Sequence, residues 1–312
     1  MLASLKLRST ATMPANPAPI TEKEVQSALT EYNAHFSKEA PASLISIRGR
    51  IIEVRIGGNI WRSCCAEDYF DDLSSALEAL AGAPYAPWDY SMEDRQDPHY
   101  TVRYAKLDFL GEIRDTIEKV GDQIQARMAE FRAAGGDEKR LFSELCYCIL
   151  TANYTAEGGM HIQNEIGEGF TVLPRDALAV RLRGLHYRFP NTRAGYIFEA
   201  RCHCGSLLET LKGFASQAAA REWLVENVKG YGHKEASHFL RNVGFTDVAI
   251  IDRHIIHFLA GKGLIDDPKK ALTRSRYIIY ERILAAIARK LGVTLAELDL
   301  YIWYMMTGKV LK

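Results

Sequence analysis

The chain has 312 residues, of which 47% are hydrophobic, and it carries 39 Lys and Arg against 39 Asp and Glu. This length and apolar content suffice for two domains, or one large domain, with a real hydrophobic core. No apolar run reaches the roughly 18 residues that a membrane-spanning helix needs, so no such helix is expected. The charge is unevenly divided, because residues 141–312 carry 22 basic and 17 acidic side chains, whereas residues 1–140 carry 17 and 22. This basic excess is modest, so any contact with a polyanion must be local and must involve the C-terminal half.

Residues 1–38 are predicted to form a flexible or helical tail. The segment begins with Ala, Ser, Thr and Pro and then continues as one polar helix. Lys6 and Arg8 are basic, and no acidic residue precedes Glu22. Three interpretations fit this composition: a transit peptide, a disordered tail, or a true translation start at Met13.

Residues 39–106 are predicted to form a small α+β accessory module. Apolar and polar residues alternate from Leu44 to Ile56, which predicts strands that turn at Gly57-Gly58-Asn59. A helix is expected at residues 68–80, and a Pro/Gly-rich turn follows from Gly82. A further strand is expected at residues 100–104.

From residue 107 to residue 312 the hydrophobic period is almost everywhere that of a helix. Clear examples are residues 276–291 and 295–306, and glycine hairpins and short loops separate the helices. We therefore expect a mainly α protein, with an all-helical domain in two lobes and a functional site between them.

The six cysteines occur in close pairs, but none of them forms a Cys-x-x-Cys motif. Cys202-His203-Cys204 supplies one imidazole and two thiols at a spacing that does not make a zinc site. Cys146 and Cys148 lie in an apolar run and are predicted to be core residues. Buried free thiols are the expected state, and no metal site is predicted.

Gly230 and Gly232 flank Tyr231 between two amphipathic segments, which predicts a helical hairpin. Glycine permits a sharp turn and a close approach of the backbone to a ligand. The free N–H groups and the dipole of the helix that begins near His233 favour an anion such as phosphate. We therefore predict phosphate binding by Lys229, Gly230 and Gly232. An ordinary helical hairpin with a glycine turn is the alternative.

Lys234 lies in the first turn of that helix, where a cation opposes the helix dipole. Because this position lowers stability, the lysine is expected to have a function there. A helix N-terminus and partial burial both favour the neutral amine. A neutral lysine attacks an electrophilic carbon and forms a Schiff base. Asp252 follows the apolar run from Val248 to Ile251, so its carboxylate is expected to be partly buried and to need a partner. It is predicted to assist the amine, and a structural helix cap is the alternative.

The C-terminal segment adds Trp303, whose broad π face suits a flipped purine, and Lys312, the last residue of the sequence. The run Tyr301, Trp303 and Tyr304 can instead be core packing, and a terminal lysine can be a frayed end.

Residues 228–254 resemble the helix-hairpin-helix plus Gly/Pro-Asp superfamily of DNA glycosylases, in particular its bifunctional members. More narrowly, residues 141–312 are similar to the archaeal-type 8-oxoguanine DNA glycosylase/AP lyases. The region of resemblance, residues 141–312, covers slightly more than half of the chain, and the segments that carry it are residues 141–153, 188–193, 228–253 and 297–312. Several related glycosylases carry an iron–sulfur cluster after the position of Asp252, but this chain lacks the cysteines for one.

The resemblance implies that Lys234 is the catalytic nucleophile and that Asp252 assists it. It further implies that Trp303 stacks on the extruded base and that Lys312 contributes to base recognition. Phe189 is expected on the opposite face of the base, and Asn153 is expected to donate a hydrogen bond in the pocket.

The function that follows is excision of 8-oxoguanine from double-stranded DNA through a lysine Schiff base, with a strand nick by β-elimination. No cofactor is expected, and the protein is expected to be a monomer without a membrane partner. It would act inside the cell, in the cytoplasm or nucleoid, or in the nucleus or mitochondrion of a eukaryote. The alternatives are a related glycosylase for another oxidised base and a non-catalytic helix-hairpin-helix DNA-binding module. The preferred opposite base and the role of residues 1–106 do not follow from the sequence.

Overall fold

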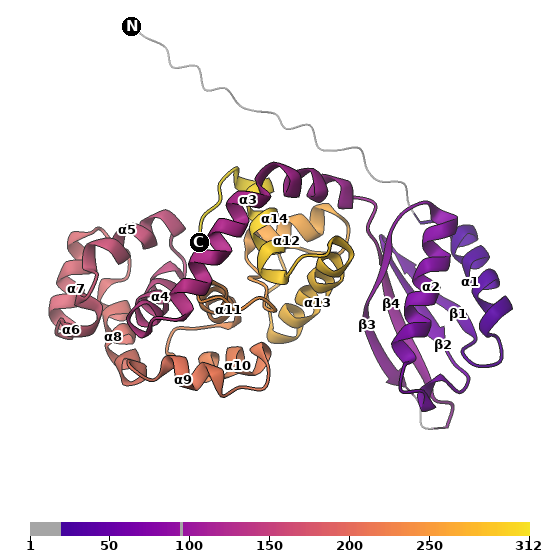
Figure 1. Ribbon diagram of the computed structural model, residues 1–312, viewed down its shortest axis with the longest axis horizontal. Helices are drawn as coiled ribbons and strands as arrows, with labels where there is room; N and C mark the ends of the chain where they lie inside the picture. Colours follow the sequence, from indigo (N-terminus) through magenta and orange to yellow (C-terminus); the bar gives the residue numbers. More distant parts are fainter. Residues whose placement is uncertain (1–19, 94–95) are drawn as a thin grey trace, which may run out of the picture.

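A computed structural model describes residues 20–93 and 96–312 of the chain. These residues form three hydrophobic cores. One core lies in the N-terminal α+β module, and the other two lie in the two lobes of the helical part (Figure 1). The structure thus confirms the predicted mainly helical, two-lobed fold with a small α+β module in front. Lys6, Arg8 and Met13, on which the interpretations of the tail rest, lie outside the described residues.

The N-terminal module is a four-stranded antiparallel sheet with strand order β1-β2-β4-β3. The strands are β1 (Ala42–Arg48), β2 (Ile51–Ile56), β3 (Tyr85–Glu93) and β4 (His99–Lys106). Helices α1 (Glu22–Phe36) and α2 (Ala66–Ala81) pack on one face of the sheet (Figure 1). Their apolar sides meet the alternate residues of the strands, such as the fully buried Val54 in β2.

Two predictions within this module were wrong. The turn between the first two strands lies at Gly49 and Arg50, and not at residues 57–59, which instead follow β2. Gly49 has a φ of +58°, which suits it to this tight connection. Strand β3 was not predicted, because the Pro/Gly-rich composition from Gly82 onward, which includes Pro87, indicated a turn. Since β3 is an edge strand and its register shifts between Pro87 and Asp89, the proline interrupts no central ladder.

The helical part begins with α3 (Leu110–Gly135), which runs along both lobes (Figure 1). The first lobe contains α4 (Glu138–Thr151), α5 (Ala156–Ile166), α6 (Gly169–Val172), α7 (Arg175–Gly184), α8 (Pro190–Ala200), α9 (Leu207–Lys212) and α10 (Gln217–Asn227). The second lobe contains α12 (Arg253–Gly261), α13 (Arg274–Leu291) and α14 (Leu295–Thr307). Helix α11 (His233–Asn242) lies between the lobes and packs on α3, α4 and α10. Short 3-10 helices occur at Ile60–Arg62 and Arg201–His203.

The module is joined to the second lobe through α13, which packs against β3. Arg282 on α13 forms an ion pair with Asp89 on β3, and Lys290 forms one with Glu78 on α2. Among the described residues, no helix is both long and apolar enough to cross a membrane.

Candidate active site

The predicted helical hairpin is present and connects α10 with α11. Gly230 has a φ of +91°, and a Cβ at this position would lie only 2.5 Å from the Tyr196 ring. Both the conformation and the close approach therefore require glycine. Tyr231 is buried, and its hydroxyl donates to the main-chain oxygen of Leu145 at 3.0 Å. This bond anchors the hairpin to α4, while Gly230 and Gly232 stay partly exposed.

Lys234 is the second residue of α11, and Gly232 is the N-cap of this helix. About a third of the Lys234 side chain is exposed, and its Nζ lies 3.7 Å from Oε1 of Glu235. The other carboxylate oxygen of Glu235 accepts from the Gly232 N–H at 3.2 Å. Lys229, in the hairpin itself, is exposed and lies 3.2 Å from Glu199. An incoming phosphate at this hairpin would therefore compete with two carboxylates.

Asp252 is the N-cap of α12, and its Oδ1 accepts from the main-chain N–H groups of His254 and Ile255 at 2.8 and 2.9 Å. Asp252 is therefore a helix cap, which is the alternative role that the sequence left open. Both bonds end on Oδ1, so Oδ2 accepts none of the hydrogen bonds found within residues 20–93 and 96–312. An aspartate in this arrangement has one oxygen committed to the helix and one available to a substrate.

His238, a buried histidine one turn after Lys234, lies on α11 and interacts with the C-terminal residue Lys312. Burial lowers the pKa of the His238 imidazole well below its usual value, and the charges of Arg241, Lys234 and Lys312 act in the same direction. All three cations are therefore close enough to act on the charge of one ring. The ring also packs edge-on against Tyr147 of α4, with the two centroids 5.5 Å apart. The structure thus brings Lys234 and Lys312 to the same region.

Asp252 is connected to the same region through Asp299 on α14. Burial raises the pKa of the Asp299 carboxyl to about 6, and the charge of Asp252 acts in the same direction while Arg241 opposes it. Arg241 forms a buried ion pair with Asp299. Since Arg241 lies on the Lys234 helix, this pair joins α11 to α14 beside Asp252.

Trp303 is partly exposed on α14, in contrast to Tyr301, which is fully in the core. Its ring packs edge-on against His254, with centroids 4.7 Å apart and an interplanar angle of 72°. His254 follows Asp252 by two residues, so Trp303 and Asp252 belong to the same cluster. Tyr301 is thus a core residue, whereas Trp303 is only partly buried.

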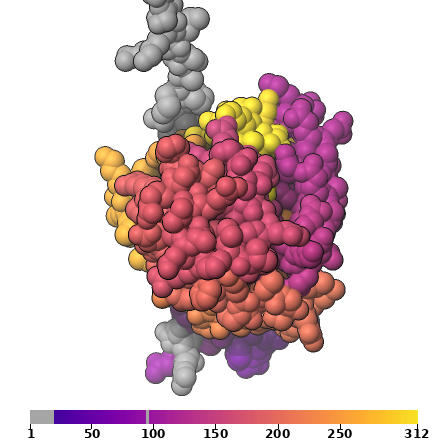
Figure 2. All heavy atoms as spheres, turned by 90° about the vertical axis from the view of Figure 1, so that its left-hand side faces the viewer, coloured from indigo at the N-terminus to yellow at the C-terminus, as the bar shows by residue number. Residues whose placement is uncertain are grey.

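Lys312 is held on all sides and is not a frayed end. Its Nζ lies 2.6 Å from Glu144 and 2.6 Å from Gln163, and its main-chain oxygen accepts from the Tyr147 hydroxyl at 3.1 Å. Figure 2 shows the C-terminal segment at the surface, between the first lobe and α3.

Phe189 and Asn153 lie on the first lobe, at helix boundaries. Phe189 is the N-cap of α8 and is partly buried, with the Arg188 guanidinium 4.9 Å from its ring centre. Asn153 is exposed directly after α4 and has a φ of +62°. In the part of the chain that the structure describes, no ring contact joins Phe189 to Trp303, so a sandwich of the two rings around a base remains a prediction.

Glu144, Gln163 and His238 are polar residues of this region that the sequence reasoning did not select. A signal for Glu144 existed, because it interrupts the apolar run from Leu141 to Leu150, and a buried carboxylate needs a partner. That partner, Lys312, is 168 residues away in the sequence, so the pair was not visible.

The six cysteines are free, and Cys146 and Cys148 are buried as predicted. The prediction of burial was wrong for the other four, because Cys64 and Cys65 are exposed, as are Cys202 in the short helix Arg201–His203 and Cys204 at its C-cap. Within residues 20–93 and 96–312, no group of three His, Cys, Asp or Glu is arranged to hold a metal ion.

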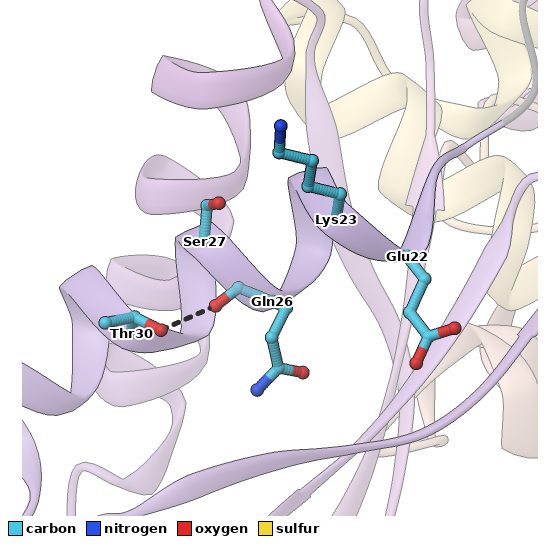
Figure 3. Close-up of a pocket in the computed structure, with 5 residues that line it drawn as sticks. All are labelled: Glu22, Lys23, Gln26, Ser27 and Thr30. Atoms are coloured by element: carbon cyan, nitrogen blue, oxygen red, sulfur yellow. Dashed lines mark hydrogen bonds between the residues drawn. The ribbon is translucent and has the colours of Figure 1, made fainter.

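The pocket drawn in Figure 3 lies far from this cluster in the sequence and the fold, on helix α1 of the N-terminal module. Its lining residues all belong to one helix face and are exposed; they are Glu22, Lys23, Gln26, Ser27 and Thr30. A depression of this kind contains no buried group that would recognise a ligand, so we assign no role to it.

Comparison with known proteins gives one consistent result. The sequence model of the family described as 8-oxoguanine DNA glycosylase matches residues 124–293. Proteins named 8-oxoguanine DNA glycosylase/AP lyase from Korarchaeum cryptofilum and Methanocaldococcus jannaschii are 48% and 50% identical to the chain. These alignments cover 62% of this chain and 92% and 94% of the relatives.

Solved structures agree with the sequence comparisons. The crystal structure of the Methanocaldococcus jannaschii 8-oxoguanine glycosylase/lyase in complex with DNA containing 8-oxoguanine matches with a TM-score of 0.63 and 47% identity. The match covers 65% of this chain and 99% of that one. The 8-oxoguanine DNA glycosylase of Thermotoga maritima matches with a TM-score of 0.62 and 43% identity, over 65% of this chain and 98% of that one.

Proposed function

The chain belongs to the family of 8-oxoguanine DNA glycosylases, and from this premise we infer that it excises 8-oxoguanine from double-stranded DNA and nicks the strand at the resulting site. The observation that carries the proposal is Lys234 in the first turn of α11, directly after the Gly230–Gly232 hairpin. The family match supplies the substrate class, and this arrangement supplies the chemistry.

Lys234 is proposed as the nucleophile. Its neutral amine attacks C1′ of the damaged nucleotide, a nitrogen–carbon bond forms, and the bond between C1′ and the base breaks. The base leaves with a proton, and the sugar opens to an iminium that joins Lys234 to C1′. Loss of a proton from C2′ then expels the 3′ phosphate, which is β-elimination. Water finally hydrolyses the iminium and frees the amine. No cofactor takes part in these steps.

Asp252 is proposed to assist this attack. Its Oδ2 is available as a proton acceptor and as a negative charge beside the sugar, while Oδ1 keeps the carboxylate oriented through the α12 cap. General acid or base assistance of this kind typically accelerates a reaction about 100- to 10,000-fold.

Base recognition is proposed to use both lobes. Chemistry at C1′ requires that the nucleotide leave the duplex stack. Trp303 would stack on the extruded base, Phe189 would cover its other face, and Lys312 with Asn153 would read its polar edge. The partly exposed Trp303 beside the Asp252 cap supports this assignment.

Phosphate binding is assigned to Lys229, Gly230, Gly232 and the start of α11. The N–H groups of a helix N-terminus favour an anion, and glycines let the DNA backbone approach closely. Because Lys229 is exposed, it is free to exchange Glu199 for a phosphate at little cost. We propose that the protein acts as a monomer in the compartment that holds the cell's DNA.

The test is incubation of the full chain with duplex DNA that contains one 8-oxoguanine, followed by measurement of base release and strand nicking. Borohydride should trap a covalent adduct between protein and DNA, because it reduces the iminium. Excision of an oxidised pyrimidine in place of 8-oxoguanine would favour the related-glycosylase alternative. DNA binding with no adduct on abasic-site DNA would leave only a non-catalytic module.

A further inference from the structure

The ammonium of Lys312 is enclosed by three partners from two helices of the first lobe. It lies 2.6 Å from Oε1 of Glu144, 2.6 Å from Oε1 of Gln163 and 4.5 Å from the ring centre of Tyr147. An ammonium has three N–H donors and no acceptor. Two donors therefore meet oxygens, while the charge also rests against an aromatic face. Only 16% of the Lys312 side chain and 12% of the Glu144 side chain are exposed, so this is not a surface ion pair.

The carboxylate of Glu144 is itself held in place. The amide of Gln163 donates to its Oε1 at 3.0 Å, and the amide of Asn242 donates to its Oε2 at 3.1 Å. Glu144 lies on α4, Gln163 on α5 and Asn242 on α11, the helix of Lys234. Three helices thus build one oriented acceptor, which the ammonium completes.

We propose that Glu144 is a positioning residue for base recognition, because its carboxylate binds the ammonium of Lys312 and holds the C-terminal segment in the site. This inference rests on the proposed function and deepens it. The lysine side chain then serves as an anchor. The main-chain oxygen of Lys312 accepts from the Tyr147 hydroxyl at 3.1 Å, so the residue is held through both its side chain and its main chain.

Besides this anchor, residues 308–312 are held by Val310, which packs against the second-lobe core, and by the bond from the Tyr147 hydroxyl to the Lys312 main-chain oxygen. Helix α14 ends at Thr307, and residues 308–312 form no helix or strand. Lys309 is also paired, with Glu157, but both side chains are more than half exposed. Exposed ion pairs contribute little, whereas a buried ammonium without its counter-charge is strongly unfavourable. Without the Glu144 charge, the short segment would move into water and the rest of the fold would remain.

The experiment measures two activities of the full chain under single-turnover conditions: release of 8-oxoguanine, and cleavage of a preformed abasic site. Glu144→Gln should slow base release about 10- to 100-fold, the range of a lost hydrogen bond to a charged group, and should leave abasic-site cleavage nearly unchanged. Gln163→Met removes the second acceptor and should cause a smaller loss with the same selectivity. In the Lys312→Met background, Glu144→Gln should have no further effect, because the two residues act as one unit.

Glu157→Gln is the matched control, since it removes a carboxylate that pairs with a lysine of the same segment at the surface. It should leave both activities unchanged. Additive effects of Glu144→Gln and Lys312→Met would overturn the inference, as would an equal loss on both substrates, which marks a structural role. A wild-type chain that releases no 8-oxoguanine would instead refute the proposed function, so the two failures are distinguishable.

Discussion

The hydroxyl of Tyr277 on α13 donates to the main-chain oxygen of Ala249 at 2.6 Å, three residues before Asp252. The same hydroxyl accepts from the Ile251 N–H at 3.3 Å and lies 3.0 Å from the Ser237 hydroxyl on α11. One buried phenol therefore ties the segment that carries Asp252 to the helix that carries Lys234. The two proposed reacting groups come from different elements, and this bond sets their relative position.

Tyr277→Phe should therefore impair catalysis as well as stability. Loss of the hydroxyl leaves main-chain groups of Ala249 and Ile251 without a partner, which costs about 1–3 kcal/mol of unfolding free energy. We also expect slower base release, because Asp252 loses its fixed position. Tyr104→Phe is the matched control, since Tyr104 is equally buried and its hydroxyl donates to the main chain of Phe70 in the N-terminal module. Equal stability losses with no difference in base release would show that the Tyr277 bond is structural only.

Lys234→Gln should abolish the adduct that borohydride traps on 8-oxoguanine DNA, because the amide cannot form an iminium. DNA binding should persist, since the hairpin is anchored through Tyr231 and Leu145 and not through Lys234. Lys229→Gln is the control and should still give the adduct. Trapping that survives in Lys234→Gln and disappears in Lys229→Gln would reassign the nucleophile.

Asp252→Asn separates chemistry from capping, because Asp and Asn are about equally good helix N-caps. The substitution keeps an oxygen for the N–H groups of His254 and Ile255 but removes the charge. Single-turnover base release should fall about 100-fold or more, while the melting temperature should change little. Asp137→Asn provides the comparison, since Asp137 caps α4 with the same pair of bonds, and it should leave the rate intact. A melting temperature that falls while base release per folded molecule persists would make Asp252 a cap and nothing more.

The hairpin and the helix around Lys234 were predictable because their signals are local. Gly230 and Gly232 are two residues apart, and the apolar period on both sides marks the helices. Strand β3 was missed for an equally local reason: Pro87 excludes a central strand, and nothing in the sequence shows that β3 lies at an edge.

Partners distant in the sequence were not predictable. Glu144 and Lys312 are 168 residues apart, and Arg241 and Asp299 are 58 apart, so only the fold brings these charges together. The position of Glu144 in an apolar run is a signal that it needs a partner, but this signal was not used and does not show which residue the partner is. The role of Asp252 was also open, since an aspartate after an apolar run is equally a cap and a catalytic group. The structure shows that Oδ1 caps α12, and the catalytic role of Oδ2 is a proposal.

Stability should fall with decreasing pH because of His238. Its folded-state pKa lies well below 6.5, so the unfolded chain binds a proton that the folded chain does not. The contribution is fully present above pH 6.5 and is lost progressively as the pH falls below that value. The Asp299 carboxyl has the opposite effect on the free energy of unfolding. Because its pKa is raised to about 6 in the folded state, it stabilises the folded chain as the pH falls below 6. His238→Gln should remove the first effect and keep the second. Denaturant unfolding at pH 7.5 and 5.5 measures both, and equal pH dependence of the two proteins would contradict the assignment.

Gly230→Ala should weaken DNA binding by displacing the hairpin. Alanine meets two obstacles there: the left-handed φ of +91°, and a Cβ that would lie 2.5 Å from the Tyr196 ring and 3.0 Å from Arg193. Gly292→Ala is the control, since Gly292 has a φ of +70° with no atom within 4 Å of the added Cβ, so it carries the backbone strain alone.

Each phosphate contact contributes about −0.9 to the slope of log affinity against log salt concentration. Loss of one or two hairpin contacts should therefore make the slope of Gly230→Ala less negative by roughly 0.9–1.8, while Gly292→Ala keeps the wild-type slope. If both variants lose affinity with unchanged slopes, the hairpin contacts no phosphate.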